Sequence, residues 1–141
     1  WVDDLSGDAT YNFGSYAECF ISENLVRKHI QEKNINLSSQ AKIEVSKRKK
    51  NETQFKNKGN ISIEIRQNPN ELSYLDMDYL ANLVDKGDPL KEALLSRDAN
   101  EYKPIRDSLM HTALLTNEAK QKLTTVYENI KGRVKKLLSG G

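Results

Sequence analysis

The chain has 141 residues, of which 30% are charged, and its formal net charge at pH 7 is +2. A chain of this length usually forms one domain, and so small a net charge produces no overall field that would attract nucleic acid. Cys19 is the only cysteine, which excludes an internal disulfide, and with His29 and His111 it leaves too few ligands for a structural zinc site.

The sequence also indicates a compartment and a larger context. No run approaches the roughly 20 apolar residues that a membrane-spanning helix needs, so we expect no membrane attachment. A single cysteine is typical of a reducing compartment, and we expect a cytoplasmic location. The chain starts at Trp1 and ends in Ser139-Gly140-Gly141, and we interpret residues 1–141 as a single domain excised from a longer protein.

The first half of the chain predicts two helices and one extended segment. Ser15 and Glu18 form a possible capping box, followed to about Lys33 by the apolar spacing of a buried helical face. Residues 37–57 fit a polar helix, although residues 42–45 alternate like a strand, and we favour the helix. Residues 61–65 alternate strictly between isoleucine and polar side chains, which predicts a short extended segment.

The second half predicts four helices from their start signals. Ser73 is the expected cap of a helix whose apolar face contains Leu75, Tyr79, Leu80 and Leu83. Asp88-Pro89 and Pro104 each predict a helix start, because proline is favoured in the first turn. The last helix is expected from Asn117, with Thr116 as its cap, to about Leu138. Its apolar residues form the clearest amphipathic pattern in the chain.

Charge is segregated along the sequence. Residues 42–58 contain seven basic and two acidic side chains, whereas residues 1–24 contain five acidic ones and no basic one. A solvated helix face is the favoured interpretation of each run taken alone. Phosphate binding is the alternative.

The hexapeptide Arg106-Asp107-Ser108-Leu109-Met110-His111 is the best candidate for chemistry. Imidazole exchanges protons near neutral pH, since its ordinary pKa is about 6.5, and guanidinium binds phosphate through paired hydrogen bonds. On a straight helix Asp107 and His111 lie about 40° apart, close enough for the carboxylate to orient the imidazole. Arg106 and His111 lie about 140° apart. They can share one phosphate only if the helix is distorted or a second chain contributes.

Residues 102–138, which include this hexapeptide, resemble the HEPN superfamily of small helical domains. Its signature is an arginine, four to six residues and a histidine, often with a polar residue after the arginine, here Asp107. Residues 72–86 resemble the helix that precedes this motif in some branches. The resemblance covers about half the chain. It implies an all-α bundle of four to five helices, here with a short extended segment near 61–65, and a homodimer whose site is built from both chains.

The resemblance also implies a function, metal-independent cleavage of RNA in which the ribose 2′-hydroxyl attacks the adjacent phosphate. His111 would act as general base or acid, Arg106 would stabilise the charged phosphorane, and Asp107 would hold the imidazole. No cofactor and no metal are expected. DNA would not be cleaved. Domains of this type occur in microbial defence, toxin–antitoxin and stress systems, sometimes fused to an ATPase or sensor.

Other interpretations stay open. Some HEPN domains are noncatalytic and dimerise, or bind nucleotides or RNA, attached to another enzyme. The Arg-Asp-His group could also be a surface cluster that only stabilises a helix or an interface. Asp76 and Asp78 could join the site from a neighbouring helix, but a charge that offsets the helix dipole is the favoured interpretation of both. His29 is interpreted as a surface or packed histidine outside the site.

Overall fold

The computed structural model describes residues 1–88 and 94–139. Within these residues the fold is entirely helical, with five α-helices and one 3₁₀ turn, and the predicted all-α class is confirmed. The elements are α1 (Val2–Glu32), α2 (Ser39–Lys58), η1 (Glu71–Tyr74), α3 (Met77–Lys86), α4 (Leu95–Met110) and α5 (Asn117–Ser139).

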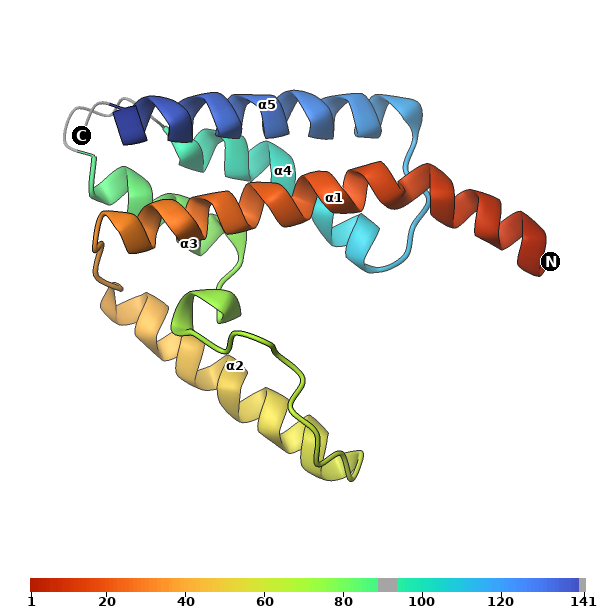
Figure 1. The fold of residues 1–141 in the computed structure, drawn as a ribbon, viewed down its shortest axis with the longest axis horizontal. Coiled ribbons are helices and arrows are strands. Elements are labelled where there is room, and N and C mark those ends of the chain that lie inside the picture. Colours follow the sequence, from red (N-terminus) through yellow and green to blue (C-terminus); the bar gives the residue numbers. More distant parts are fainter. Residues whose placement is uncertain (89–93, 140–141) are drawn as a thin grey trace.

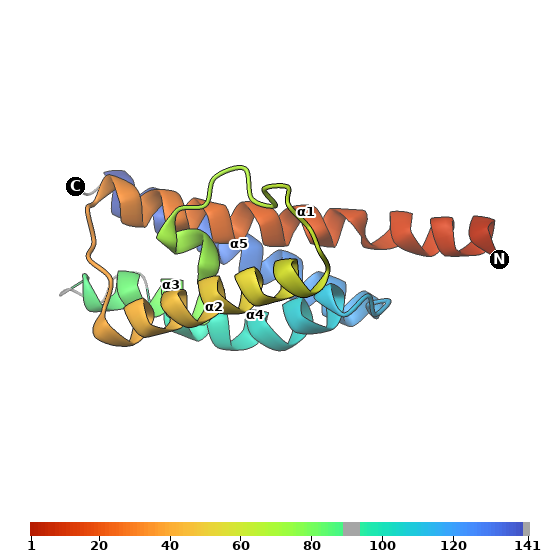
Figure 2. The same ribbon diagram turned by 90° about the horizontal axis from the view of Figure 1, so that it is seen from below.

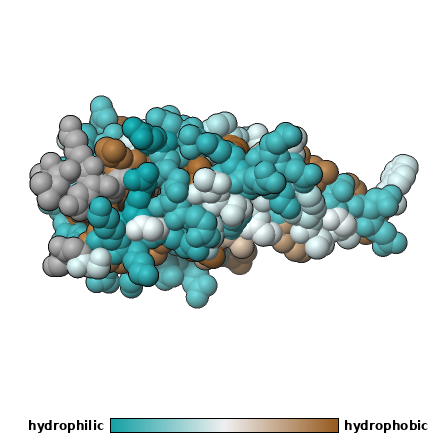
Figure 3. Space-filling view, turned by 90° about the horizontal axis from the view of Figure 1, so that it is seen from above, coloured by the Kyte–Doolittle hydropathy of each residue, from teal (hydrophilic) through white to brown (hydrophobic). Residues whose placement is uncertain are grey.

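Four of the helices form one bundle, and α2 projects from it at an angle (Figure 1). Helices α1 and α5 run in the same direction, α4 runs against them, and α3 packs on α1 and α4. The core is apolar, and its fully buried large side chains come mainly from α1, α3, α4 and α5. Seen from the α5 side, the outer surface of the bundle is mostly hydrophilic (Figure 3). No helix in the described ranges combines the length and apolarity needed to cross a membrane.

The last helix is confirmed. The side chain of Thr116 caps α5 by accepting a hydrogen bond of 3.0 Å from the backbone N–H of Ala119. The predicted stripe is buried at Leu123, Val126, Ile130 and Val134. The cap and the apolar stripe could both be predicted, because each depends on residues that are close together in the sequence.

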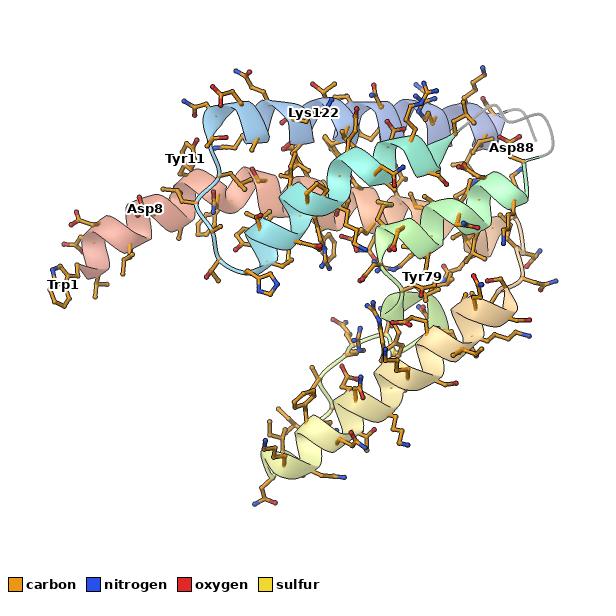
Figure 4. The ribbon with its side chains drawn as sticks, turned by 180° about the vertical axis from the view of Figure 1, so that it is seen from behind. Trp1, Asp8, Tyr11, Tyr79, Asp88 and Lys122 are labelled. Atoms are coloured by element: carbon orange, nitrogen blue, oxygen red, sulfur yellow. The ribbon has the colours of Figure 1, made fainter. Side chains whose placement is uncertain are left out.

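Helix α1 begins at Val2, so the predicted start at Ser15 is wrong. Ser15 is 1% exposed and lies inside the helix, facing the bundle rather than capping an end. The preceding residues form a helical arm that extends past the other helices, carrying Trp1 and Asp8 (Figures 2 and 4). Its first ten residues are all exposed, so no buried apolar face marked them in the sequence.

The segment at 61–65 lies outside the helices, as predicted, but it does not form a strand. These residues form an irregular loop, and its isoleucines at 61, 63 and 65 are 44%, 69% and 55% exposed. A strand needs a neighbouring strand to pair its backbone groups, and the described part of the chain contains none. Alternation of side chains was therefore insufficient to form one.

The start of the third predicted helix also differs from prediction. Ser73 lies within η1, which Asn70 caps, and α3 begins later, at Met77. Leu75, Leu80 and Leu83 are nevertheless buried as predicted. The helix expected to open at Asp88-Pro89 falls on residues 89–93, outside the described ranges.

Helix α2, predicted over 37–57, is confirmed and is attached to the bundle by a charged pair. Arg48 donates two hydrogen bonds to the carboxylate of Asp76, of 2.9 and 2.8 Å, and a third of 2.8 Å to Glu44. Ala41 and Val45 bury the adjoining apolar face. Tyr79 of α3 lies where the two helices meet (Figure 4) and its hydroxyl is 3.4 Å from Glu44.

We expect Asp76→Asn to lower the free energy of unfolding at pH 7 by about 1–2 kcal/mol, because it breaks a charge-assisted pair. Burial raises the pKa of Asp76, but the hydrogen bonds and charge of Arg48 outweigh it and leave the pKa below its usual 3.8. A carboxyl with a lowered folded pKa stabilises the fold above its unfolded pKa, and this contribution is lost as pH falls through the folded value.

Urea unfolding followed by circular dichroism at pH 7 and pH 3 measures this effect. The difference between the unchanged chain and Asp76→Asn should shrink at pH 3. Asp8→Asn, on the exposed arm of α1, is the charge-matched control and should change stability little. An equal Asp76→Asn effect at both pH values would show that the ionised carboxylate is not its source.

Candidate active site at the end of α4

Helix α4 carries the predicted motif, and it begins at Leu95 rather than at Pro104. The carboxylate of Asp85 accepts hydrogen bonds of 2.8 Å from the backbone N–H groups of Leu95 and Ser96, which caps the helix from α3. Pro104 lies inside the helix and cannot donate to the preceding turn. Burial of Leu95, Ala99 and Tyr102 compensates for that missing bond. The predicted start at Pro104 is therefore wrong.

Arg106 is held by a buried carboxylate on α1. Its Nε lies 3.3 Å from Oε2 of Glu23, whose side chain is 8% exposed. The Tyr102 hydroxyl donates a short hydrogen bond to the same oxygen, and Arg27 lies 3.5 Å from the other one. Three donors from two helices thus compensate a charge that would be costly to bury alone.

The surroundings of Glu23 shift neighbouring pKa values. Burial, then the negative charge of Glu23, raises the pKa of Tyr102 far above its usual range, so its hydroxyl stays protonated as a donor. Burial raises the pKa of Cys19 to about 11, which excludes this thiol as a nucleophile at neutral pH. Neither group is a proton-transfer catalyst at physiological pH.

A cleft of about 570 Å³ opens beside Arg106, between α1, α4 and the segment that leads into η1. Two further arginines line it, Arg27 and Arg66, together with Phe20 and Met110, which are 71% and 41% exposed. Arg27 is fully engaged, because it also donates to the backbone carbonyls of Leu72 and Leu75. The cleft thus combines positive charge with accessible apolar side chains.

Asp107 contacts Arg106 rather than His111. Its carboxylate is 3.7 Å from Nη1 of Arg106, and its side chain is about half exposed. The predicted side-chain contact with His111 is not formed; the backbone carbonyl of Asp107 instead accepts a hydrogen bond of 3.0 Å from the His111 N–H. In this arrangement Asp107 orients the arginine.

His111 lies one residue beyond α4, as its C-terminal cap, and is exposed. Its imidazole forms no hydrogen bond or ion pair with any residue that the structure describes. It is also absent from the residues that line the Arg106 cleft. The two ends of the motif therefore do not share a cleft within one chain, in line with the wide separation expected on a helix.

A left-handed residue fixes the position of His111. Thr112 has φ 64°, and hydrogen bonds from Thr112 to Leu109 and from Ala113 to Ser108 close the helix end as a Schellman motif. Helices α1 and α2 end in the same motif, with Asn34 and Asn60 in the left-handed position. A β-branched residue is sterically unfavourable there, whereas asparagine is tolerated, so strain is stored next to His111.

Helix α1 also anchors the backbone on both sides of His111. Asn12 donates a hydrogen bond of 2.9 Å to the carbonyl of Ala113, and the Tyr16 hydroxyl donates one of 2.9 Å to the carbonyl of Leu109. The chain then turns into α5, where Tyr11 lies beside the first turn (Figure 4) and bonds Asn117. The backbone around His111 is thus fixed although the imidazole is exposed.

The remaining candidates lie elsewhere. Asp76 pairs with Arg48, and Asp78 lies 3.3 Å from Lys103, so both have structural partners. His29 is buried, which lowers its pKa, and belongs to the packed face of α1. Across residues 1–88 and 94–139, no three histidine, cysteine or acidic side chains are grouped as a metal site would require.

Glu23, Arg27 and Arg66 were not predicted as site residues from the sequence. Glu23 lies on the same helical face as the buried residues Cys19, Val26 and Ile30. A carboxylate within such a face indicates a buried polar contact, so Glu23 could have been predicted from the sequence. Arg27 follows one turn later. Arg66 lies in a loop, and no local pattern placed it near α4.

We expect Thr112→Asn to raise the free energy of unfolding by about 1 kcal/mol, because asparagine tolerates the left-handed conformation better than threonine does. The reciprocal change Asn60→Thr, in the same motif at the end of α2, should lower it by a similar amount. Urea unfolding of both variants gives the two changes in the free energy of unfolding. Destabilisation by Thr112→Asn would show that the 2.6 Å contact of the threonine hydroxyl with the His111 carbonyl outweighs the strain.

No protein-family model matches this chain, and no curated protein and no solved structure is significantly similar to it.

Proposed function

We propose that the chain is a metal-independent endoribonuclease of the HEPN type. The observation that carries this proposal is the arrangement at the end of α4: an arginine beside a cleft that two further arginines line, followed by an exposed histidine that caps the helix C-terminus. Guanidinium can neutralise a phosphorane, and an accessible imidazole can transfer protons at neutral pH. The resemblance of residues 102–138 to HEPN domains supports the same chemistry.

In the proposed reaction the ribose 2′-hydroxyl attacks the adjacent phosphorus and the bond to the 5′-oxygen breaks. His111 takes the proton from the 2′-hydroxyl while water protonates the departing 5′-oxygen, or His111 as imidazolium protonates the 5′-oxygen while water accepts the 2′-hydroxyl proton. The products are a 2′,3′-cyclic phosphate and a 5′-hydroxyl. Arg106 binds the non-bridging oxygens, whose charge grows in the transition state. Asp107 holds the guanidinium by the observed ion pair.

The proposed active form is a homodimer, because one chain does not bring Arg106 and His111 into one cleft. An apolar surface lies next to His111: Leu5 and Ala9 of α1 and Leu114 after α4 line a hollow, and Leu5 and Leu114 are 64% and 53% exposed. A second copy packed on this surface would bring its own residues close to His111. Two chains can then complete a site that neither forms alone.

A noncatalytic module is the second candidate, and one observation favours it. Glu23 and Asp107 both pair with Arg106, so its charge is already compensated within the chain. Such an arginine could be structural, and the domain would then dimerise, or bind a nucleotide or RNA, attached to another enzyme such as an ATPase or a sensor. If the chain is the proposed ribonuclease, we expect it to act in the cytoplasm, in a defence, toxin or stress response.

We expect the purified chain to cleave end-labelled single-stranded RNA in EDTA and to leave 2′,3′-cyclic phosphate ends. His111→Ala should lower the rate at least about 100-fold, since general acid–base catalysis contributes about 10²–10⁴. His29→Ala is a control for the loss of a histidine, with circular dichroism to verify folding, and DNA of the same sequence should stay intact. Absence of cleavage by a dimeric unchanged chain across several RNAs would favour the noncatalytic module.

We expect the chain to be a dimer in light scattering at micromolar concentration. Leu5→Asp should make it monomeric, because it places a charge on the apolar surface beside His111. Ile43→Asp is the matched control, since Ile43 is a similarly exposed aliphatic residue, 69% exposed, on α2. A monomeric unchanged chain, or equal effects of both substitutions, would contradict a dimer through this surface.

A further inference from the structure

We propose that a lysine row on α2 and the Arg106 cleft form one continuous binding path for single-stranded RNA. The proposal deepens the function above and rests on it for the reaction, but it concerns binding and can be tested without cleavage. It assigns a role to the basic run at residues 42–58, which the candidate active site leaves unexplained.

The row contains Lys42, Lys49 and Lys56, spaced seven residues apart. Seven residues are almost two full turns, so the three side chains lie on one side of α2, within about 40° of one another. Lys47 and Lys58 lie roughly opposite, about 170° from the midpoint of Lys49 and Lys56. Five of the seven basic residues therefore lie on two opposite sides of α2, with Arg48 and Lys50 between them, and the row that contains Lys49 is the side connected to the cleft.

Tyr74 joins the row to the cleft. The Lys49 ammonium lies 5.6 Å from the centre of the Tyr74 ring, and the Arg66 guanidinium carbon lies 4.0 Å from it. Arg66 is held in place by Glu52, at 2.9 Å, and by the backbone carbonyl of Ser73, at 2.9 Å. Because Arg66 also lines the cleft, cationic side chains continue from Lys49 through Arg66 to Arg106. Glu52 and Glu23 are ion-pair partners of the two arginines and lie along the same path.

The cleft offers contacts for a base as well as for phosphate. Phe20 and Met110 line it beside the arginines, and the two residues are 71% and 41% exposed. A cleft of about 570 Å³ is within the usual size range of small-ligand sites and can accept a nucleotide. Proteins that bind single strands combine a positive groove for the backbone with aromatic rings that stack on bases, and this cleft offers three arginines and the exposed ring of Phe20.

Single strands are favoured over duplexes because of the contact with Phe20. In a duplex each base face is covered by its neighbours, whereas an unpaired base can turn out and stack on a ring.

The acidic arm of α1 supports the direction of the path. Asp3, Asp4 and Asp8 are exposed on that arm, so a polyanion is repelled there and attracted along α2. Figure 1 shows α2 and the arm as separate projections from the bundle.

Binding of a fluorescein-labelled 2′-O-methyl RNA of about 12 nucleotides tests the path, since this probe cannot undergo 2′-hydroxyl attack. Fluorescence anisotropy from 50 to 200 mM NaCl gives Kd and its salt dependence for the full chain. Lys49→Ala/Lys56→Ala should weaken binding about tenfold and reduce the slope of log K against log salt by about 1.4, or about 0.7 for each phosphate that a lysine no longer neutralises. Phe20→Ala should weaken binding about fivefold or more.

Lys47→Ala/Lys58→Ala is the matched control, with the same helix and the same change of net charge, and should weaken binding less than about threefold. Equal losses for the two lysine pairs would overturn the path and indicate nonspecific attraction to α2. Equal affinity for the single strand and its duplex would overturn the proposed single-strand preference. Circular dichroism confirms that each variant is folded.

The outcomes separate this inference from the proposed function. If Lys49→Ala/Lys56→Ala weakens binding but the unchanged chain does not cleave ordinary RNA, the path is supported and the proposed nuclease activity is contradicted. Cleavage that needs His111 but is unaffected by the row, with unchanged binding, would support the nuclease and overturn the path.

Discussion

The buried carboxylate of Glu23 is the interaction on which the geometry of the site depends. It lies on α1, and it accepts hydrogen bonds from Tyr102 and Arg106 of α4 and from Arg27 of its own helix. Removal of any donor would leave a buried charge less compensated, which is costly. Tyr102 and Arg106 are one turn apart, so a single carboxylate fixes both the rotation of α4 about its axis and its position along α1.

The sequence predicted those parts of the fold that depend on local patterns. The cap and apolar stripe of α5 and the polar helix α2 are confirmed for this reason. Failures occurred where tertiary contacts decide. Asp85, ten residues away, caps α4 and sets its start ahead of Pro104. The isoleucines at 61, 63 and 65 alternate correctly for a strand but find no partner strand among the described residues.

The same distinction applies to the candidate site. Arg106, Asp107 and His111 were recognisable because they lie within six residues, and the structure places all three at the end of α4. Their contacts were not predictable, because the helix ends at Met110 and places His111 on a cap instead of on the helical face shared with Asp107. The cleft itself combines Arg106 with residues far away in the sequence, such as Arg66 in a loop and Glu23 on α1.

The strained end of α4 connects these observations. Thr112 occupies a left-handed position that asparagine fills at the ends of α1 and α2, and Asn12 and Tyr16 of α1 fix the backbone on both sides of His111. The Thr112 side chain donates a hydrogen bond to the His111 carbonyl, so the strained residue acts on the backbone that carries the candidate histidine. Strain held in place by contacts from another helix is typical of functional sites. The exposed imidazole therefore lies on a backbone that α1 holds by hydrogen bonds on both sides, and in the proposed reaction a phosphate or a second chain would be its partner.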